Sequence, residues 1–279
     1  MTLRKFFQLS VLSFVATIHG AWAGDVAVSN YPLYLLSQEV TQGKADATLL
    51  LQAGDVGHHG NLSPSALKAI KEGQFVVWFG ADLEQNVATT LQNSPNAISL
   101  FAFDAFTRKP LRDIDGKAIA GSFDPHIWLH PTNAKAIVAA LTVIHSHANP
   151  QYKADYAQNA EQFYQKMDKA AAQYRNNAPR PYFAYHDAFQ YVEPVLNLQF
   201  QGALTPDHHL APKASRFKAL QSADDQKTRC LASQLPISDG IKAKLAPINT
   251  LVRQEDMSDS QDFVSGWQAL AAAFMQCTD

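Results

Sequence analysis

The chain is poor in cysteine, in net charge and in long hydrophobic runs. Two of its 279 residues are cysteines, and 25 acidic residues nearly balance 23 basic ones. A net charge of −2, with the histidines neutral, leaves no electrostatic footprint for a nucleic acid. After the N-terminal segment, no apolar run approaches the roughly 20 residues that span a bilayer. The composition therefore argues against binding to nucleic acid and against further membrane spans.

The N-terminal segment has the three parts of a secretory signal peptide. Arg4 and Lys5 form a basic start, residues 6–18 are mostly apolar, and Ala21-Trp22-Ala23 is a small-residue cleavage site. A membrane anchor is the competing interpretation, but the apolar part is shorter than a span requires. Because no cysteine follows it, we expect no lipid anchor. The sequence predicts export of a soluble protein after cleavage behind Ala23.

The two cysteines, Cys230 and Cys277, both lie near the C-terminus. In the oxidising compartments that exported proteins reach, two remaining cysteines usually form one disulfide. Ligation of a metal by the thiolates is the alternative, but neither cysteine has a second cysteine or a histidine at a ligand spacing.

Strand-like and helix-like segments alternate over most of the chain. Short apolar runs predict strands at 25–29, 47–51, 75–79, 97–100, 182–185, 200–204, 230–232 and 248–252. Helical patterns are expected at 33–41, from 63, at 82–91, 132–147 and 151–177, from 187, and at 212–222, 238–245 and 260–275. This order of elements favours parallel sheets with right-handed crossovers.

The helix expected at 151–177 is long enough, at roughly 40 Å, to cross a small domain. The polar residues 107–122 are expected to form a surface loop. We therefore predict an α/β fold of two lobes, each with a parallel β-sheet flanked by helices, joined by one long rigid α-helix. A helical link bends little, so closure of the lobes should be small. The expected parts are a signal peptide (1–23), an N-terminal lobe (24–150), the connecting helix (151–178) and a C-terminal lobe (179–279).

Three histidines lie beside the apolar runs: His58, His126 and His186. Ligands of open parallel sheets bind beyond the carboxyl ends of the strands, where at least His58 and His186 are expected. A single histidine at such a place is more often a satisfied hydrogen-bonding group than a ligand. Three of them, spread over both halves, make a shared metal ion an equal alternative. Three other histidines have structural interpretations near helix ends: His130, His145 and His147.

The longer context of these histidines resembles a known family. Residues 182–193 read Tyr-Phe-Ala-Tyr-His-Asp-Ala-Phe-Gln-Tyr-Val-Glu, and residues 124–129 read Asp-Pro-His-Ile-Trp-Leu. His58 lies six residues before the helix-opening Pro64, and residues 75–84 combine an apolar strand with a glutamate. The ordered set, from about residue 25 to residue 277, resembles the substrate-binding proteins of ABC transporters for zinc and manganese.

The resemblance implies a metal ion in the cleft between the lobes. His58 and His126 would bind it from the first lobe and His186 from the second, with His59 as the alternative to His58. It also implies the disulfide between Cys230 and Cys277. The expected role is a periplasmic, monomeric protein that captures Zn²⁺ as transported ligand and delivers it to an inner-membrane ABC permease.

The sequence departs from that family in several places. The loop at 107–122 contains no histidine, although zinc members often carry a histidine-rich loop there, and Gly57 replaces a glutamate. By this resemblance, Asn249 stands where many members have a fourth ligand, an aspartate. A bound water is therefore the first choice for the fourth position, and the substitutes are Glu255, Asp256 and His59. The cluster Asp207-His208-His209 is either an exposed loop or a weak accessory metal site.

Three imidazoles favour Zn²⁺ over Mn²⁺, which prefers oxygen ligands. A histidine binds a metal ion only as neutral imidazole, so the affinity for the metal should fall as the pH drops through about 6.5. Glu84, Asp124 and Asp187 are candidates for orienting the rings. The alternatives are a manganese-specific binding protein of the same family, a zinc enzyme with three histidine ligands, and an adhesin with a structural metal. No general base or nucleophile motif supports the enzyme.

Overall fold

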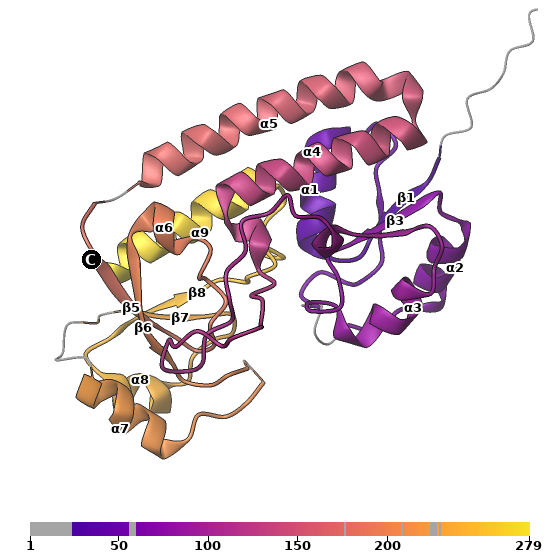
Figure 1. The fold of residues 1–279 in the computed structure, drawn as a ribbon. Helices are drawn as coiled ribbons and strands as arrows, with labels where there is room; N and C mark the ends of the chain where they lie inside the picture. Colours follow the sequence, from indigo (N-terminus) through magenta and orange to yellow (C-terminus); the bar gives the residue numbers. More distant parts are fainter. Residues whose placement is uncertain (1–23, 56–59, 176, 208, 224–227, 229) are drawn as a thin grey trace, which may run out of the picture.

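The computed structural model describes residues 24–55, 60–175, 177–207, 209–223, 228 and 230–279. It contains two four-stranded parallel sheets, as predicted (Figure 1). The first has the order β2-β1-β3-β4 and consists of β1 (Val26–Val28), β2 (Thr48–Leu49), β3 (Phe75–Trp78) and β4 (Ala97–Ser99). The second has the order β6-β5-β7-β8 and consists of β5 (Arg180–Ala184), β6 (Leu198–Ala203), β7 (Cys230–Ser233) and β8 (Asn249–Val252). We call the sheets with their helices the first and second lobe.

Helices flank both sheets and begin at recognisable sequence signals. Asn30 and Ser63 cap the first two helices through their side chains, and a proline follows in each first turn. The α-helices are α1 (Tyr31–Thr41), α2 (Pro64–Glu72), α3 (Ala88–Gln92), α4 (Pro131–Ala148), α5 (Lys153–Tyr174), α6 (Glu193–Leu196), α7 (Ala214–Ala223), α8 (Asp239–Leu245) and α9 (Phe263–Thr278). Single 3₁₀ turns are η1 (Gln85–Val87), η2 (Leu100–Ala102), η3 (Ile127–Leu129) and η4 (Pro150–Tyr152).

The long helix α5 runs alongside α4 and reaches from one lobe to the other (Figure 1). At 22 residues it is somewhat shorter than predicted, about 33 Å long. Its apolar stripe is buried as expected against α1, α4 and α9, and consists of Tyr156, Ala160, Phe163, Met167 and Ala170. Residues of both lobes join one hydrophobic core through this helix. The packing therefore couples the two lobes along the whole length of α5.

The helix predicted from Asp187 does not form at that residue. Residues 185–187 are bends, and the short α6 begins only at Glu193, with Pro194 in its first turn. Asp187 would suit a helix N-terminus, but its carboxylate is held by Arg112. The carboxylate therefore makes a long-range ion pair and does not cap a helix.

The segment 107–122 is more than the surface loop that its composition predicts. Arg112 and Ala118 form an antiparallel bridge within it, and Ile114 O accepts a hydrogen bond from Ala203 N at 2.9 Å. Ala203 belongs to β6, which is one of the two edge strands of the second sheet. Because edge strands leave backbone groups unpaired, they invite such a cover. The segment therefore starts in the first lobe and packs on the second.

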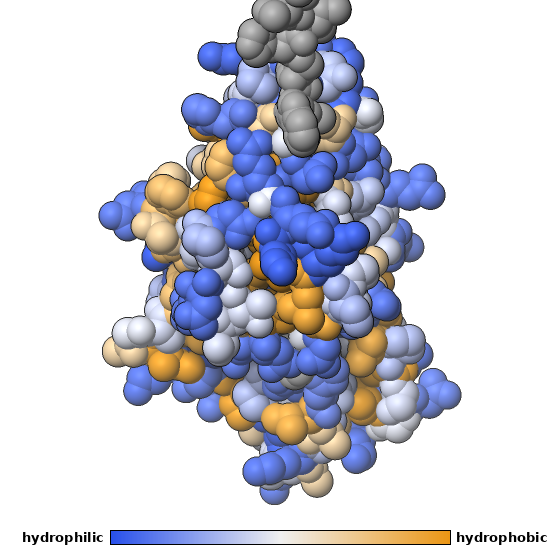
Figure 2. Space-filling view, turned by 90° about the vertical axis from the view of Figure 1, so that its right-hand side faces the viewer, coloured by the Kyte–Doolittle hydropathy of each residue, from blue (hydrophilic) through white to orange (hydrophobic). Residues whose placement is uncertain are grey.

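A disulfide joins Cys230 on β7 to Cys277 on α9, so the thiolates are not free for a metal. Among the described residues, no helix combines the length and the hydrophobicity needed to cross a bilayer. Figure 2 shows a face on which hydrophilic side chains predominate and hydrophobic ones occupy smaller areas between them.

Candidate metal centre

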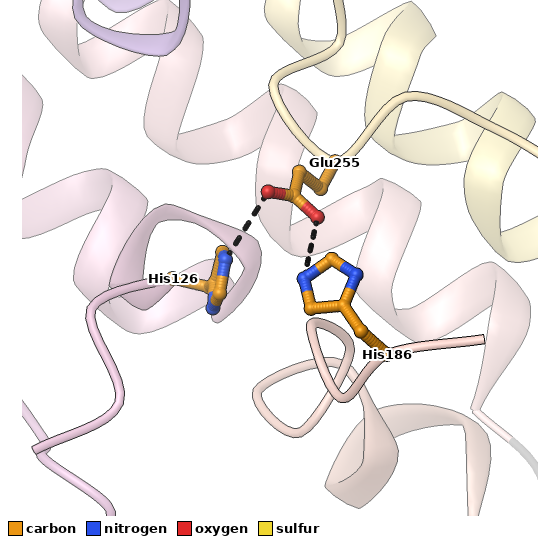
Figure 3. A group of neighbouring side chains, drawn as sticks. All are labelled: His126, His186 and Glu255. Atoms are coloured by element: carbon orange, nitrogen blue, oxygen red, sulfur yellow. Dashed lines mark hydrogen bonds and ion pairs between the residues drawn. The ribbon is translucent and has the colours of Figure 1, made fainter. Parts of the chain in front are cut away.

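Three buried side chains from three separate segments meet between the lobes: His126, His186 and Glu255 (Figure 3). His126 directly precedes the turn η3 and follows the segment 107–122 that packs on the second lobe. His186 follows β5 and Glu255 follows β8, both in the second sheet. The carboxyl ends of parallel strands lie at one edge of a sheet, which brings these two side chains together.

The ligand atoms of the three residues lie within 4.8 Å of one another. His126 Nε2 is 3.3 Å from Glu255 Oε1, and His186 Nε2 is 3.3 Å from Glu255 Oε2. Ligand atoms around a tetrahedral zinc ion are separated by about 3.3 Å, given bonds of about 2.0 Å. The three residues are 3%, 7% and 1% exposed. The cluster therefore matches a small, dry metal site in both spacing and burial.

The other ring nitrogen of each histidine has its own hydrogen-bond partner. His126 Nδ1 lies 2.8 Å from Asp124 Oδ1, which also accepts from the backbone N of His126 at 3.0 Å. His186 Nδ1 lies 3.0 Å from Gln234 Oε1. An oxygen acceptor at Nδ1 places the ring proton there, which leaves the Nε2 lone pair for a metal. Asp124 is thus the hydrogen-bond partner of the His126 ring.

Gln234 is a site residue that the sequence interpretation missed. It directly follows β7, at the same sheet edge as His186 and Glu255, and that position is the signal that could have found it. The sequence search for residues that orient the rings considered acidic side chains, so the amide of Gln234 gave no indication of this role.

The cluster is electrostatically incomplete without a cation. Two imidazole lone pairs and a carboxylate would face one another. These groups repel one another unless a proton or a metal ion lies between them. Burial lowers the pKa of His126, but the carboxylates of Glu255 and Asp124 outweigh it and raise this pKa to about 10. The negative charge that favours a proton here would also favour a divalent cation, which would have to displace that proton.

The loop after β8 is fixed from both sides. Glu255 O accepts a hydrogen bond from the indole Nε1 of Trp128 at 2.8 Å. Asp256, the next residue, accepts from Gly54 N and from Ser258 N, each at 2.9 Å. Of the two neighbouring carboxylates considered as ligands, Glu255 thus enters the cluster, and Asp256 instead holds backbone.

Other predicted site residues lie elsewhere or cannot be placed. His58, His59 and His208 lie outside the described residues, and so does Gly57. Asn249 stands at the start of β8 and donates its amide to Cys277 O at 3.0 Å, so it does not face the cluster. The carboxylate that follows the late strand is that of Glu255.

Glu84 and Asp187 have hydrogen-bond partners other than the imidazole rings of His126 and His186. Glu84 is fully buried and accepts hydrogen bonds from Ser29 Oγ, from Asn30 Nδ2 at 2.6 Å and from Gly80 N at 2.8 Å. Burial raises its pKa to about 7, although these bonds act in the opposite direction. Asp187 is paired with Arg112 through both of its oxygens.

The remaining histidines behave mostly as structural groups. His130 Nδ1 accepts from Thr132 N and so caps α4. His145 is fully buried, with Nε2 2.8 Å from Ser37 Oγ, and burial lowers its pKa to about 4. His147 is exposed on the same helix. His209 N donates to Asp207 Oδ1 within the local turn.

Comparison with known proteins points to zinc uptake. Residues 26–248 match the model of a family described as zinc-uptake complex component A, periplasmic. The high-affinity zinc uptake system protein ZnuA of Brucella abortus is 24% identical over 238 residues, which cover 70% of this chain and 71% of that protein.

Solved structures share the fold. A crystal structure of ZnuA superposes with a TM-score of 0.76 at 19% identity, over 92% of this chain and 100% of that one. The Zn(II)-bound AdcA of Streptococcus pneumoniae gives a TM-score of 0.72 at 21% identity, over 92% of this chain and 58% of that one. The family model covers most of the chain, and the chain therefore belongs to the family of periplasmic component A proteins of zinc-uptake complexes.

Proposed function

We propose that the protein is a periplasmic substrate-binding protein that captures Zn²⁺ and delivers it to an inner-membrane ABC permease. The observation that supports this most strongly is the convergence of two Nε2 atoms and one carboxylate in a buried cluster. A Zn(II)-bound relative of the same fold supports the choice of metal. The metal is the cargo, so the protein has to release it as well as bind it.

The proposed ligands are His126, His186 and Glu255, with His58 as the fourth and His59 as its alternative. Glu255 replaces the bound water that the sequence suggested for the fourth position, because its two oxygens already lie between the imidazoles. Nitrogen ligands favour zinc over manganese, whereas each carboxylate weakens that preference. Asp124 and Gln234 orient the rings.

A manganese-specific binding protein is the alternative within the family. A zinc enzyme is the alternative from another class, because two histidines, a glutamate and a water also form catalytic zinc sites. Four protein ligands would leave no position for such a water, so we infer that the protein is not an enzyme. Detectable hydration or hydrolysis by the zinc-loaded protein would reverse this inference.

Export of the chain is part of the same proposal. Residues 1–23 act as a signal peptide cleaved behind Ala23, and the mature protein works as a monomer without a lipid anchor or a nucleic-acid partner. The proposed parts of the mature chain are the lobes at 24–150 and 179–279 and the connecting helix at 151–178.

Competitive titration with a zinc chelator tests the function. We expect His126→Ala, His186→Ala and Glu255→Gln each to weaken zinc binding by at least tenfold, since each removes a ligand. His58→Ala tests the ligand that the structure does not describe. His147→Ala is the matched control, because His147 is exposed and remote in sequence from the cluster. Unchanged zinc affinity in all ligand variants would refute the assignment, and manganese binding as tight as zinc would overturn the metal.

A further inference from the structure

The segment 107–122, which we call the strap, carries a chain of hydrogen bonds toward the metal centre. Lys109 N donates to Tyr191 Oη at 2.9 Å, and Lys109 Nζ donates to Gln190 O at 2.8 Å. The amide of Gln190 donates to Asp124 Oδ2 at 3.1 Å, and Tyr191 Oη donates to Asp124 O at 2.9 Å. The strap, the residue that orients His126 and the segment after β5 are thus joined to one another.

Arg112 makes the strongest of the strap's contacts. Its Nε and Nη2 reach the two oxygens of Asp187 at 2.7 Å each, in the fork geometry that guanidinium and carboxylate share. Nη2 and Nη1 also reach Glu193 at 2.7 and 3.1 Å. The guanidinium carbon lies 4.2 Å from the ring centre of Phe200. With side-chain exposures of 13%, 10% and 13%, the Arg112, Asp187 and Glu193 group is largely shielded from solvent.

The position of this clamp matters because Asp187 directly follows His186. Residues 185–187 are bends, so the histidine stands on backbone that belongs to no helix or strand. Gln234 orients the His186 ring, but an orienting hydrogen bond cannot fix the backbone from which the ring projects. Asp187 is anchored through both oxygens to a segment that leads directly to Asp124 and His126.

We propose that Arg112 is a positioning residue of the metal centre, which fixes His186 relative to His126 by clamping Asp187 from the strap. The proposal rests on the function proposed above. Zinc requires its ligand atoms to be placed within a few tenths of an ångström, so a looser His186 backbone costs affinity without removing any ligand. A strap without histidines ties the two ligand-bearing segments together rather than gathering metal.

Arg216, which contacts the same strap from α7, provides a matched control. From α7 its guanidinium donates to Ile114 O and to Ala203 O, and pairs with Asp115. It therefore fastens the strap to the second lobe at a different place, through bonds that do not involve Asp187. Replacing either arginine by alanine loosens the strap, but the positioning account predicts loss of zinc affinity for Arg112 alone.

The test is a chelator competition that measures Kd and the zinc dissociation rate for the mature protein and five variants. They are Arg112→Ala, Arg112→Lys, Asp187→Asn, the double variant Arg112→Ala/Asp187→Asn, and Arg216→Ala. Loss of a direct partner of a metal ligand weakens binding by about 10- to 100-fold, and Arg112 acts on His186 only through the backbone of Asp187, so we expect Arg112→Ala and Asp187→Asn each near the lower end. The double variant should bind zinc no more weakly than the weaker of the two single variants, because both substitutions remove the same Arg112–Asp187 contact. Lysine should restore part of the affinity, and Arg216→Ala should stay within about threefold of the wild type.

Melting temperatures of the metal-free variants separate positioning from general destabilisation. Equal losses of zinc affinity in Arg112→Ala and Arg216→Ala would refute the positioning role, and so would additive losses in the double variant. If Arg112→Ala does not fold, Asp187→Asn decides alone, since it leaves Arg112 paired with Glu193. A wild-type protein that binds no zinc, or a His186→Ala variant that binds it normally, would instead refute the proposed function.

Discussion

At the scale of single residues, the proposed metal site is a place where a proton and a metal ion would compete. Glu255 faces the Nε2 atoms of His126 and His186 at 3.3 Å each, and it is almost completely buried. The same carboxylate that raises the pKa of His126 to about 10 would bind the metal. Zinc binding should therefore release a proton even at pH values well above those at which an ordinary histidine becomes neutral.

Calorimetry in buffers of different ionisation enthalpy measures this release. At pH 8.5 we expect the wild-type protein to release about one proton per zinc, because the raised pKa keeps His126 protonated in the absence of metal. Affinity should rise with pH until about pH 10. The Glu255→Gln variant should release much less at pH 8.5, since the main charge that raises this pKa is gone. Equal release by both proteins would contradict the account.

A second residue-scale prediction concerns His145, which is buried as a neutral ring beside Ser37. Its folded pKa of about 4 lies below the value of about 6.5 in an unfolded chain, so the unfolded state binds the proton first as the pH falls. The contribution of neutral His145 to the free energy of unfolding is complete above pH 6.5 and is lost progressively down to about pH 4. When the pH falls from 7 to 5, protonation of His145 in the unfolded state should lower the free energy of unfolding by about 2 kcal/mol.

The comparison for this prediction is His145→Gln, whose amide can still bond Ser37 but does not titrate. In urea denaturation of the metal-free proteins, the wild type should lose more stability than the variant from pH 7 to pH 5. Parallel pH dependence of the two proteins would show that His145 is not responsible.

At the scale of elements, local patterns predicted what local forces decide. Apolar runs located the strands, their order predicted parallel pairing, and the stripe on α5 is buried as expected. The prediction of a helix from Asp187 was wrong because its carboxylate pairs with Arg112, 75 positions earlier in the chain. Gln234 escaped notice for the same reason, since its role depends on which strands are neighbours. Glu255 was named only as one of several substitutes, because spacing alone does not show which carboxylate faces the histidines.

The disulfide is the element-scale constraint whose effect can be measured most simply. It joins β7 to α9 across a sequence separation of 47 residues. Cross-linking a loop of this size stabilises the fold by about 4 kcal/mol if the loss of unfolded-chain entropy dominates. We expect a Cys230→Ala/Cys277→Ala variant to lose about 2–4 kcal/mol in urea denaturation while still binding zinc, because neither cysteine is in the cluster. Loss of zinc binding in a folded double variant would contradict this.

At the scale of the whole molecule, the two lobes share one core along α5 and are tied again by the strap. Two separate connections, one helical and one through largely shielded ion pairs, leave little freedom for a hinge. The sequence predicted small closure from the helix alone. The strap adds a reason that the sequence did not reveal, because its polar composition is typical of an exposed loop.

Small-angle X-ray scattering tests this rigidity. The radius of gyration of the mature protein should change by less than about 1 Å on addition of zinc, because the ligand-bearing segments are already held together. The Arg112→Ala variant, in which one connection is weakened, should show a larger change. A large compaction of the wild type would mean that zinc, and not the fold, brings the lobes together.

The central claim is that Zn²⁺ binds between His126, His186 and Glu255. The most direct measurement is a crystal structure of the mature, zinc-loaded protein with anomalous diffraction recorded on both sides of the zinc absorption edge. We predict one strong zinc peak at about 2.0–2.2 Å from both Nε2 atoms and from an oxygen of Glu255. A zinc peak elsewhere, with none within bonding distance of these three residues, would contradict the account.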